Sequence, residues 1–469
     1  MSPHLHIANP KSYMDGVPAV QQCPIAPGKT FTYRFRADLY GSSWYHAHYT
    51  IEYVLGIVGP MIIHGPENYP YDVDLGPVFI QDHYHKGFWE LLEDVMSTDL
   101  GTSIGAGTSD NNLINGKNNF NCSSTNSTNP CVSNAGLSQF YFKPGKWHRL
   151  RLINAGAEGL QHFSIDGHKM DIIATDFVPC VRNTQTVAPL GIGQRMDVLV
   201  YGSGKEGESY WMRSVIQQCS GAKNPVALAV VHYPGSDQTL APTTEAWADD
   251  LPPCQDLDAS FLVPFHPSTP QPPAESYTVN IAFGPNATGH WLWTMNGVSF
   301  RGDYDAPTLL MTKAARNTSQ PYPFPPYYNA YTTNPANDTT QVVMFHLNNT
   351  VPVAHPFHFH GHNMYLLSQG EGPWNGSVTS SPNPPRRDVF ILPPSGHLVI
   401  SYNATNPGAW PMHCHIAWHI STGLFIQTVE QTDWIQQYMS IPESLAQCCR
   451  EWWDYSGHNV VSFPLCLKF

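Results

Sequence analysis

The sequence predicts an all-β protein built from β-sandwiches, and both its composition and its residue patterns indicate this class. Glycine supplies 36 and proline 42 of the 469 residues, and both interrupt the chain throughout. Aromatic residues make up 12% and charged residues only 13%. These proportions favour short strands joined by many ordered turns. A series of β-sandwich domains is therefore the expected architecture.

Alternation of apolar and polar residues identifies the predicted strands. A period of two is typical of a strand with one buried face. The clearest runs, in chain order, are Thr30–Phe35, Trp147–Ile153, Met196–Tyr201 and Val342–Leu347. We expect each of these runs to form a strand.

Helical periodicity is persuasive at only two places, Phe88–Val95 and Thr432–Gln447. Proline-rich stretches at Pro66–Pro70 and Ala241–Pro273 indicate boundaries between folded units. The predicted division is a partial first domain over 1–70, a second domain over 71–240, a linker over 241–275 and a third domain over 276–469.

The charge balance and hydropathy exclude two classes of partner. A formal net charge of −13 argues against nucleic acid, because phosphate binding needs clustered Lys and Arg. No stretch approaches the roughly 18 uninterrupted apolar residues of a membrane span. We therefore expect no nucleic-acid partner and no membrane partner. We also expect a monomer.

Sequons and cysteines indicate secretion. The chain holds eight N-x-[ST] sequons and ten cysteines, which suit an oxidising, glycosylating route, although sequons also arise by chance. Met1–Pro10 has neither the basic nor the apolar region of a signal peptide. We expect an extracellular protein whose natural start, signal peptide included, precedes Met1.

Histidine pairs of the form HxH are more frequent than chance predicts. With 23 histidines about one such pair is expected at random, and six occur. Residues i and i+2 of a strand project from the same face, so one strand can offer two imidazoles to neighbouring metals. Imidazole suits copper, zinc and iron alike. The pairs are His4/His6, His46/His48, His83/His85, His358/His360, His360/His362 and His413/His415.

The segment His413–His419 (HCHIAWH) selects copper among these metals. In an extended HCH the cysteine faces one way and both histidines the other, so one strand can ligate two centres. A thiolate with two imidazoles and a weak or absent axial ligand makes a blue-copper site. Cys414 and His419 supply two of these ligands, and His355 is the natural third. The alternative is a structural zinc site or hydrogen-bonded core histidines.

These motifs resemble the copper-binding signatures of the multicopper oxidases, and the chain looks like an ascomycete-type laccase. The resemblance runs from about Met14 to about Tyr455. It implies three cupredoxin-like Greek-key β-sandwich domains, the first truncated, with copper held within the third and between the first and third. Supporting similarity lies in Met14–Gly28, Ser43–Tyr49, Gly193–Val198 and Trp293–Gly297.

The resemblance also implies a ligand set for four coppers, one of type 1, one of type 2 and two of type 3. Leu424 matches the axial position of the type 1 copper, where a leucine cannot coordinate and a higher potential is expected. The implied ligands are His355, Cys414 and His419 for type 1, His358 with His4 for type 2, and His6, His46 and His415 against His48, His360 and His413 for the type 3 pair.

Two acidic residues are further candidates. Asp15 matches a family acid close to the type 2 copper, where it could orient ligands or relay protons, or it is a turn residue. Glu158 matches an acidic position beside the phenol pocket, where it could accept the phenolic proton, or it is an exposed loop residue. His362 is expected to be structural rather than a ligand, and His83 and His85 to be surface or structural histidines.

By the same resemblance Cys219 pairs with Cys254, and Cys23 with Cys448 or Cys449. Cys122 and Cys131 could close a local loop, although connectivity does not follow from sequence. The first domain departs from the family, because only about 65 residues precede the second whereas a complete sandwich needs about 100. His4 and His6 also lack the usual Trp and Gly neighbours, so they could instead be a chance pair.

The predicted function is a copper-dependent laccase. Phenols or aromatic amines would lose single electrons near His419, and dioxygen would be reduced to water. Ferroxidase, ascorbate oxidase and pigment-forming phenol oxidase are rivals within the enzyme class. A copper-binding protein without oxidase activity is the rival outside it.

Overall fold

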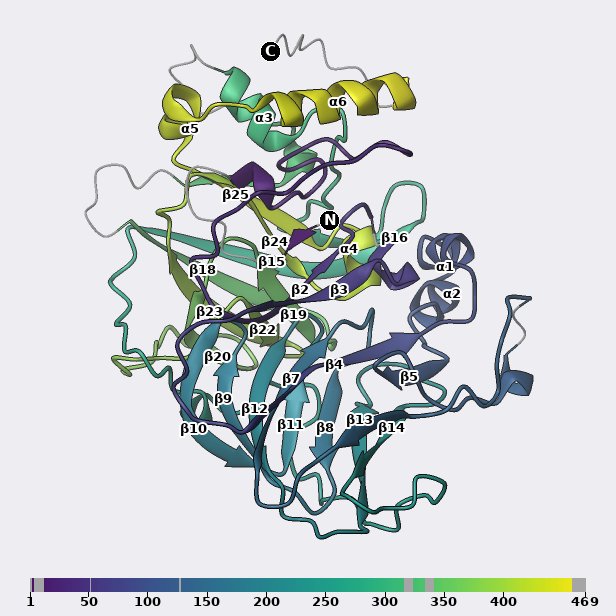
Figure 1. Cartoon of the computed structure of the whole chain (residues 1–469). Coiled ribbons are helices and arrows are strands. Elements are labelled where there is room, and N and C mark those ends of the chain that lie inside the picture. The colour runs from purple at the N-terminus through teal and green to yellow at the C-terminus, as the bar shows by residue number, and fades with distance from the viewer. Residues whose placement is uncertain are drawn as a thin grey trace.

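The computed structural model describes residues 2–3, 12–50, 52–125, 128–315, 324–333 and 341–457. His4 and His6 lie outside these residues. Strands dominate the described chain and helices are few, so the all-β prediction is confirmed. The sheets fall into three units along the chain (Figure 1). The domain limits given above stay a prediction.

The first unit contains one three-stranded sheet, with β1 at Ser2–Pro3, β2 at Gly41–His46 and β3 at Val58–Ile63. The prediction of a strand at Thr30–Phe35 is wrong. The alternation is real, since Phe31, Tyr33 and Phe35 pack against a buried apolar cluster while the residues between them are exposed. However, this segment pairs with no strand among the described residues, and pairing rather than periodicity defines a strand.

The second unit is a two-sheet sandwich around a single apolar core. Strands were predicted at Trp147–Ile153 and Met196–Tyr201, and the structure confirms both. One sheet has the order β10 (Val178–Gln185), β9 (Met170–Thr175), β12 (Arg195–Tyr201), β7 (Trp147–Asn154), β4 (Val73–His83), β5 (Asn111–Ile114). The other has the order β11 (Val187–Leu190), β8 (Gln161–Ile165), β13 (Ser209–Ile216), β14 (Val226–His232), β6 (Ser138–Tyr141).

The third unit is a second two-sheet sandwich. The strand predicted at Val342–Leu347 is present as β18. One sheet has the order β16 (Trp291–Met295), β15 (Glu275–Pro285), β18 (Val342–Asn349), β23 (Gly396–Asn403), β20 (Met364–Glu371), β21 (Arg386–Arg387). The other has the order β17 (Ala330–Thr333), β25 (Phe425–Glu430), β24 (Gly408–Cys414), β19 (His355–Phe359), β22 (Val389–Leu392).

Most helices lie at the periphery of the sandwiches, whereas α4 lies inside the molecule beside β24 (Figure 1). The helix predicted at Phe88–Val95 is present, but Thr432–Gln447 forms two helices instead of one. Pro442 explains the break, because the residue before a proline disfavours helical backbone and proline then starts the next helix well. The α-helices are α1 (Phe88–Val95), α2 (Leu100–Gly105), α3 (Thr308–Ala314), α4 (Ala417–Ser421), α5 (Thr432–Tyr438) and α6 (Glu443–Ser456). The 3-10 helices are η1 (Ser12–Met14), η2 (Glu52–Leu55), η3 (Cys122–Ser124), η4 (Ala259–Phe261) and η5 (Pro326–Tyr328).

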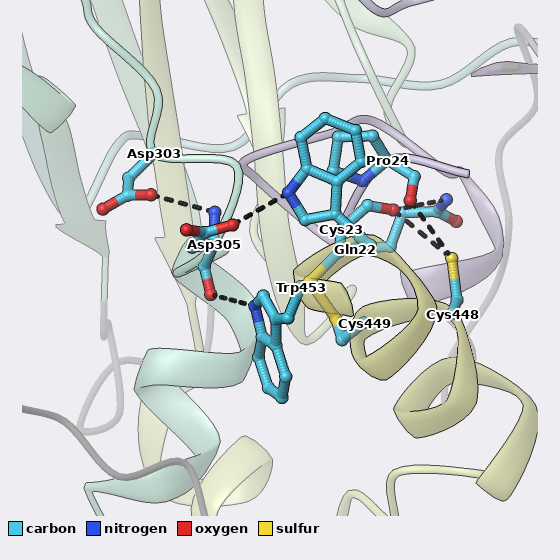
Figure 2. The surroundings of a disulfide bond; sticks show 9 residues. Gln22, Cys23, Pro24, Asp303, Asp305, Cys448, Cys449 and Trp453 are labelled. Atoms are coloured by element: carbon cyan, nitrogen blue, oxygen red, sulfur yellow. Dashed lines mark hydrogen bonds between the residues drawn. A yellow bond between two sulfur atoms is a disulfide. The ribbon is translucent and has the colours of Figure 1, made fainter. Parts of the chain in front are cut away.

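The described residues form three disulfides, namely Cys23–Cys449, Cys122–Cys131 and Cys219–Cys254. The first joins the N-terminal unit to helix α6 across 426 positions of sequence (Figure 2). Sequence left the partner of Cys23 open, and the structure selects Cys449. Cys448, beside it on α6, keeps a thiol that donates to the carbonyl oxygens of Cys23 and Pro24. Within the described residues, no helix is both long and apolar enough to cross a membrane.

Candidate metal centres

Two adjacent strands of the third unit position the predicted metal ligands. Strands β19 and β24 pair antiparallel, with Phe357 opposite Cys414 and His358 opposite His413. Successive side chains of a strand point to opposite faces, so Cys414 and His413 project to different sides of the same sheet. Helix α4 begins directly after this segment and turns His419 back toward Cys414.

On one side lies a three-residue group that we call the sulfur site: His355, Cys414 and His419. Cys414 Sγ is 3.6 Å from Nδ1 of His355 and 3.5 Å from Nδ1 of His419. The two nitrogens are 3.1 Å apart. These separations leave room for one metal ion at about 2.0–2.3 Å from each atom, the usual range for nitrogen and sulfur ligands.

The chemistry of the sulfur site favours a bound cation. Burial lowers the pKa of His355 to about 3, so its imidazole is neutral, as a ligand must be. Burial also raises the pKa of the Cys414 thiol well above its usual value. A bound metal would offset that cost, because coordination deprotonates a thiol. The Ile416 amide donates to Cys414 Sγ at 3.4 Å and helps to hold the sulfur.

Leu424 lies beside the sulfur site and is fully buried. Its carbonyl oxygen accepts a hydrogen bond from the Cys414 amide at 3.2 Å. Its side chain offers no donor atom to a metal. Trp293 closes the same region, with its ring 4.7 Å from the His355 ring and 4.5 Å from the His419 ring. The sulfur site is therefore enclosed by apolar groups and provides three ligand atoms.

On the other side lies a larger group that we call the histidine cluster. It combines the end of β2 in the first unit with β19, β24 and the residues that follow them in the third unit. Neighbouring rings have centroids 4.5 to 5.8 Å apart, and every member is buried. The cluster consists of His46, His48, His358, His360, His413 and His415.

Hydrogen bonds set the tautomers of these histidines. Carbonyl oxygens can only accept, and they take the Nδ1 proton of His46 at 2.8 Å, His358 at 2.9 Å and His413 at 2.8 Å. The Asp15 carboxylate takes that of His360 at 2.8 Å. In a neutral imidazole with a protonated Nδ1, Nε2 carries the lone pair. Nε2 is therefore the ring atom through which such a histidine would bind a metal.

Two of these Nε2 atoms face each other. Nε2 of His360 lies 3.1 Å from Nε2 of His413, a distance at which the two nitrogens share either a proton or a bound metal cation. Nε2 of His48 is buried and has no hydrogen-bond partner among the described residues. Burial is the main cause that lowers the pKa of His48 and His413 well below the usual value, with neighbouring imidazoles adding to it. The cluster therefore fits metal cations.

Asp15 and Glu158 occupy different surroundings. Asp15 is fully buried, and its carboxylate accepts hydrogen bonds from His360 Nδ1 at 2.8 Å and from Gln21 Nε2 at 2.9 Å. Through the first of these bonds it orients the His360 ring. Glu158 is only partly buried, in a loop whose amides donate to the carboxylate of Asp82. Burial and the nearby charge of Asp82 raise the pKa of Glu158 well above its usual value.

The remaining histidine pairs stand apart from both groups. His362 donates from Nδ1 to the His360 carbonyl at 2.9 Å, and its Nε2 lies 3.2 Å from a Glu430 carboxylate oxygen. The His85 ring stacks on Phe120, with His83 beside it. These contacts give the histidines structural partners.

Some residues around the two groups were not singled out from sequence. Asp388 holds His358 through its carbonyl oxygen, and the Trp44 ring stacks on His46 at 4.4 Å. Asp82 organises the loop that carries Glu158. Trp44 and Trp293 lie in Ser43–Tyr49 and Trp293–Gly297, two of the segments that resemble the multicopper oxidases. That resemblance did not assign either tryptophan a role. For Asp82 and Asp388 no local pattern existed, because their partners are distant in sequence.

Known proteins resemble the chain in sequence and in fold. Multicopper oxidase family models match residues 2–68, 74–236 and 302–433. Laccase-1 of Botryotinia fuckeliana is 38% identical over 420 residues, which is 89% of this chain and 70% of that protein. Oxidoreductase OpS5 of Beauveria bassiana is 37% identical over 443 residues, which is 93% of this chain and 73% of that protein.

Solved structures agree with the sequence relatives. The laccase from Botrytis aclada matches with a TM-score of 0.85 and 31% identity over 98% of this chain and 83% of its own. Fet3p, a multicopper oxidase that functions in iron import, matches with a TM-score of 0.79 and 24% identity over 96% of this chain and 84% of its own, which shows the fold alone. Sheets, metal-ligand geometry and relatives lead to one conclusion: the chain belongs to the multicopper oxidases, with cupredoxin-like β-sandwich domains, and is a laccase-like copper-dependent oxidoreductase.

Proposed function

We propose that the chain oxidises phenols or aromatic amines one electron at a time at the sulfur site and reduces dioxygen to water at the histidine cluster. His355, Cys414 and His419 would hold the type 1 copper, with Leu424 at the axial position. Bound copper would supply one-electron redox chemistry at the first site and dioxygen reduction at the second. The proposed cluster ligands are His4 and His358 for type 2, with His6, His46, His415, His48, His360 and His413 for the type 3 pair.

One observation carries this proposal: Cys414 belongs to the sulfur site while its bonded neighbours belong to the histidine cluster. Only covalent bonds of one strand separate the two sites. Reduction of dioxygen to water takes four electrons, whereas each phenol gives one. A direct path from His419 and Cys414 to His413 and His415 meets that need.

Substrate is proposed to dock beside His419, which is partly exposed whereas His355 is fully buried. Glu158 would accept the phenolic proton as the electron leaves, a role for which a raised pKa suits a carboxylate. Trp418, next to His419, donates from Nε1 to the Tyr84 hydroxyl at 3.2 Å and closes one wall. A site without an axial sulfur donor favours such aromatic substrates.

Dioxygen is proposed to reach the histidine cluster at His48. Two cavities, of about 400 and 290 Å³, are both lined by this residue. The smaller one is bounded by Phe300, Phe425 and Ile420, and its apolar walls suit a small apolar gas. Protons would use the larger one, where Glu52 and Tyr49 offer polar groups.

Copper content and dioxygen consumption test the proposal together. We expect about four coppers per chain, a blue absorption band and phenol-dependent dioxygen uptake. A blue band without dioxygen uptake would favour a copper-binding protein that lacks oxidase activity. Faster turnover of ferrous iron than of any phenol would favour a ferroxidase.

We also propose that the protein acts outside the cell as a monomer. Its sequons and three disulfides suit the secretory route. Recovery from the culture medium with a mass that falls on glycosidase treatment would support this location. Light scattering at the mass of one chain would support the monomer.

A further inference from the structure

The second unit supplies none of the six residues of the histidine cluster, yet one of its turns lies directly against them. This turn, residues 191–194, joins β11 to β12, whose first residue is Arg195. We propose that Gly193 and Arg195 are positioning residues, which hold His415 and His358 at the spacing that the coppers require. The proposal rests on the proposed function, because it assigns these residues a task at that cluster.

Gly193 leaves room for the His415 ring. A Cβ atom at this position would lie 2.5 Å from Cδ2 and 3.0 Å from Cγ of His415, closer than side chains approach one another. The backbone has φ of +83°, which residues other than glycine seldom adopt. Because His415 is fully buried, with the Trp44 and Tyr53 rings around it, the imidazole has little freedom to move away. The backbone of Gly193 therefore forms one wall of the space that holds the His415 ring.

Arg195, the residue that follows this turn, connects both ligand-bearing units. Its guanidinium donates to the two carboxylate oxygens of Asp388 at 2.6 and 2.7 Å, and its Nε donates to the Ser42 carbonyl at 3.3 Å. Ser42 belongs to β2, four residues before His46. The Asp388 carbonyl accepts from His358 Nδ1 at 2.9 Å. One side chain thus links the strand of His46 to the residue that orients His358.

A second ion pair, between Asp176 and Arg387, lies against the pair of Arg195 with Asp388. Asp176 accepts from the Arg195 amide at 2.9 Å and from the Asp388 amide at 3.2 Å, and it forms a two-pronged pair with Arg387. Arg195, Asp176 and Asp388 are all essentially inaccessible to solvent. Buried ion pairs add little net stability compared with apolar packing, whereas their directional hydrogen bonds define a geometry. The arrangement is therefore better explained by positioning than by stability.

The competing explanation is that the sheet alone holds His358. In the pairing of β19 with β22, His358 lies opposite Val389, and the Phe359 amide also donates to the Asp388 carbonyl at 2.9 Å. If this ladder suffices, loss of the Arg195 contacts leaves copper binding unchanged. The two explanations differ in a measurable quantity, the copper held by the cluster.

The sharpest test compares Gly193→Ala with Gly207→Ala in the full chain. Gly207 has φ of +84° in the same unit, but an added Cβ there would meet nothing within 4 Å. Both variants carry the same backbone strain, and only Gly193→Ala touches His415. We expect Gly193→Ala to keep the blue band but to bind copper at the cluster about 10–100-fold more weakly, measured by copper per chain and by electron paramagnetic resonance. Equal copper in the two variants overturns the role of Gly193.

Arg195→Lys tests the proposed role of Arg195, and Arg213→Lys is its control. Arg213 makes a similar two-pronged pair with Asp166 at 2.8 Å for each bond, but within the second unit. Lysine keeps the charge and loses the fork that spans Asp388. We expect only Arg195→Lys to lose copper from the cluster while the blue band persists. Loss of copper in both variants, or in neither, contradicts the role of Arg195.

The wild-type protein separates failure of this proposal from failure of the proposed function. Wild type without a blue band or with no copper at the cluster refutes the proposed function. Wild type with a full copper complement, alongside an unaffected Gly193→Ala and an unaffected Arg195→Lys, refutes only the positioning role. If either variant fails to fold while its matched control folds, the far-ultraviolet circular dichroism reports it, and a general structural role replaces the one proposed.

Discussion

The sulfur site and the histidine cluster share one strand but are assembled differently. All three residues of the sulfur site belong to the third unit, and two of them are five positions apart. The histidine cluster joins strand β2 of the first unit to β19 and β24 of the third. We conclude that the sulfur site depends on the folding of one sandwich, whereas the cluster depends on how separate units pack. Changes between units should therefore harm the cluster first.

The largest effect is expected for Cys414→Ser. Electrons are proposed to pass through Cys414 from the sulfur site to His413 and His415, so its loss interrupts the whole path. The blue band should vanish and phenol-dependent dioxygen uptake should fall to background, because serine is a poor ligand for copper at this site. Copper at the histidine cluster should remain, since its ligands are unchanged. Absorption spectra, an oxygen electrode and copper analysis check these outcomes. Turnover that survives the substitution would refute the proposed electron route.

Asp15→Ala should have the next largest effect and should separate the two sites. The Asp15 carboxylate holds Nδ1 of His360 at 2.8 Å, and loss of such a partner of a metal ligand costs about 10–100-fold in metal affinity or activity. The sulfur site lies on the opposite side of the strand, so the blue band should persist. Dioxygen uptake and copper content per chain measure the result. If the blue band is lost together with turnover, the two sites are less independent than we conclude.

Glu158→Gln should have a smaller effect that depends on pH. Burial and Asp82 raise the pKa of Glu158, so the proton-accepting carboxylate exists only above that raised value. Phenol turnover by wild type should therefore rise as pH increases through the Glu158 pKa, and Glu158→Gln should lose this rise and be several-fold slower above it. Ferrocyanide, which releases no proton on oxidation, serves as the control and should show no such difference. An unchanged pH profile with phenol would exclude Glu158 as the proton acceptor.

The raised pKa of Glu158 also predicts how the stability of the fold changes with pH. A carboxyl group whose folded pKa exceeds its unfolded pKa stabilises the fold below the unfolded value, and this contribution is lost as pH rises through the folded value. Glu158→Gln removes this loss of stability at higher pH, because glutamine does not titrate. The variant should thus become more stable relative to wild type at neutral pH than at acid pH, as thermal unfolding at both pH values would show.

Cys23→Ser should leave turnover at moderate temperature nearly unchanged while it weakens the connection between units. The Cys23–Cys449 disulfide closes the longest loop of the three, and removal of a native disulfide costs about 2–5 kcal/mol of stability. On mild heating, copper should leave the histidine cluster before the blue band fades. Cys448→Ser is the control, because its thiol is not bridged. Simultaneous loss of both signals would contradict the difference between the two sites.

Local patterns predicted much of this protein. Strands at Trp147–Ile153, Met196–Tyr201 and Val342–Leu347 followed from alternation, and the grouping of Cys414 with His355 and His419 followed from ligand chemistry and strand geometry. Where a pattern depended on a partner elsewhere, it did not suffice. Thr30–Phe35 alternates correctly but pairs with no strand in the described chain. The helix expected over Thr432–Gln447 failed for a local reason instead, because Pro442 lies inside that span and divides it.

The sequence by itself determined which faces of a strand carry the ligands, because the alternation of side chains is a property of covalent geometry over a few residues. It also identified the chemistry, since a cysteine between histidines has few other uses at that spacing. Only the tertiary structure decided that Arg195 meets Asp388, that Asp15 meets His360 and that Cys23 bonds Cys449 rather than Cys448. Those contacts join residues far apart in the chain, and they depend on how three folded units pack rather than on any local period.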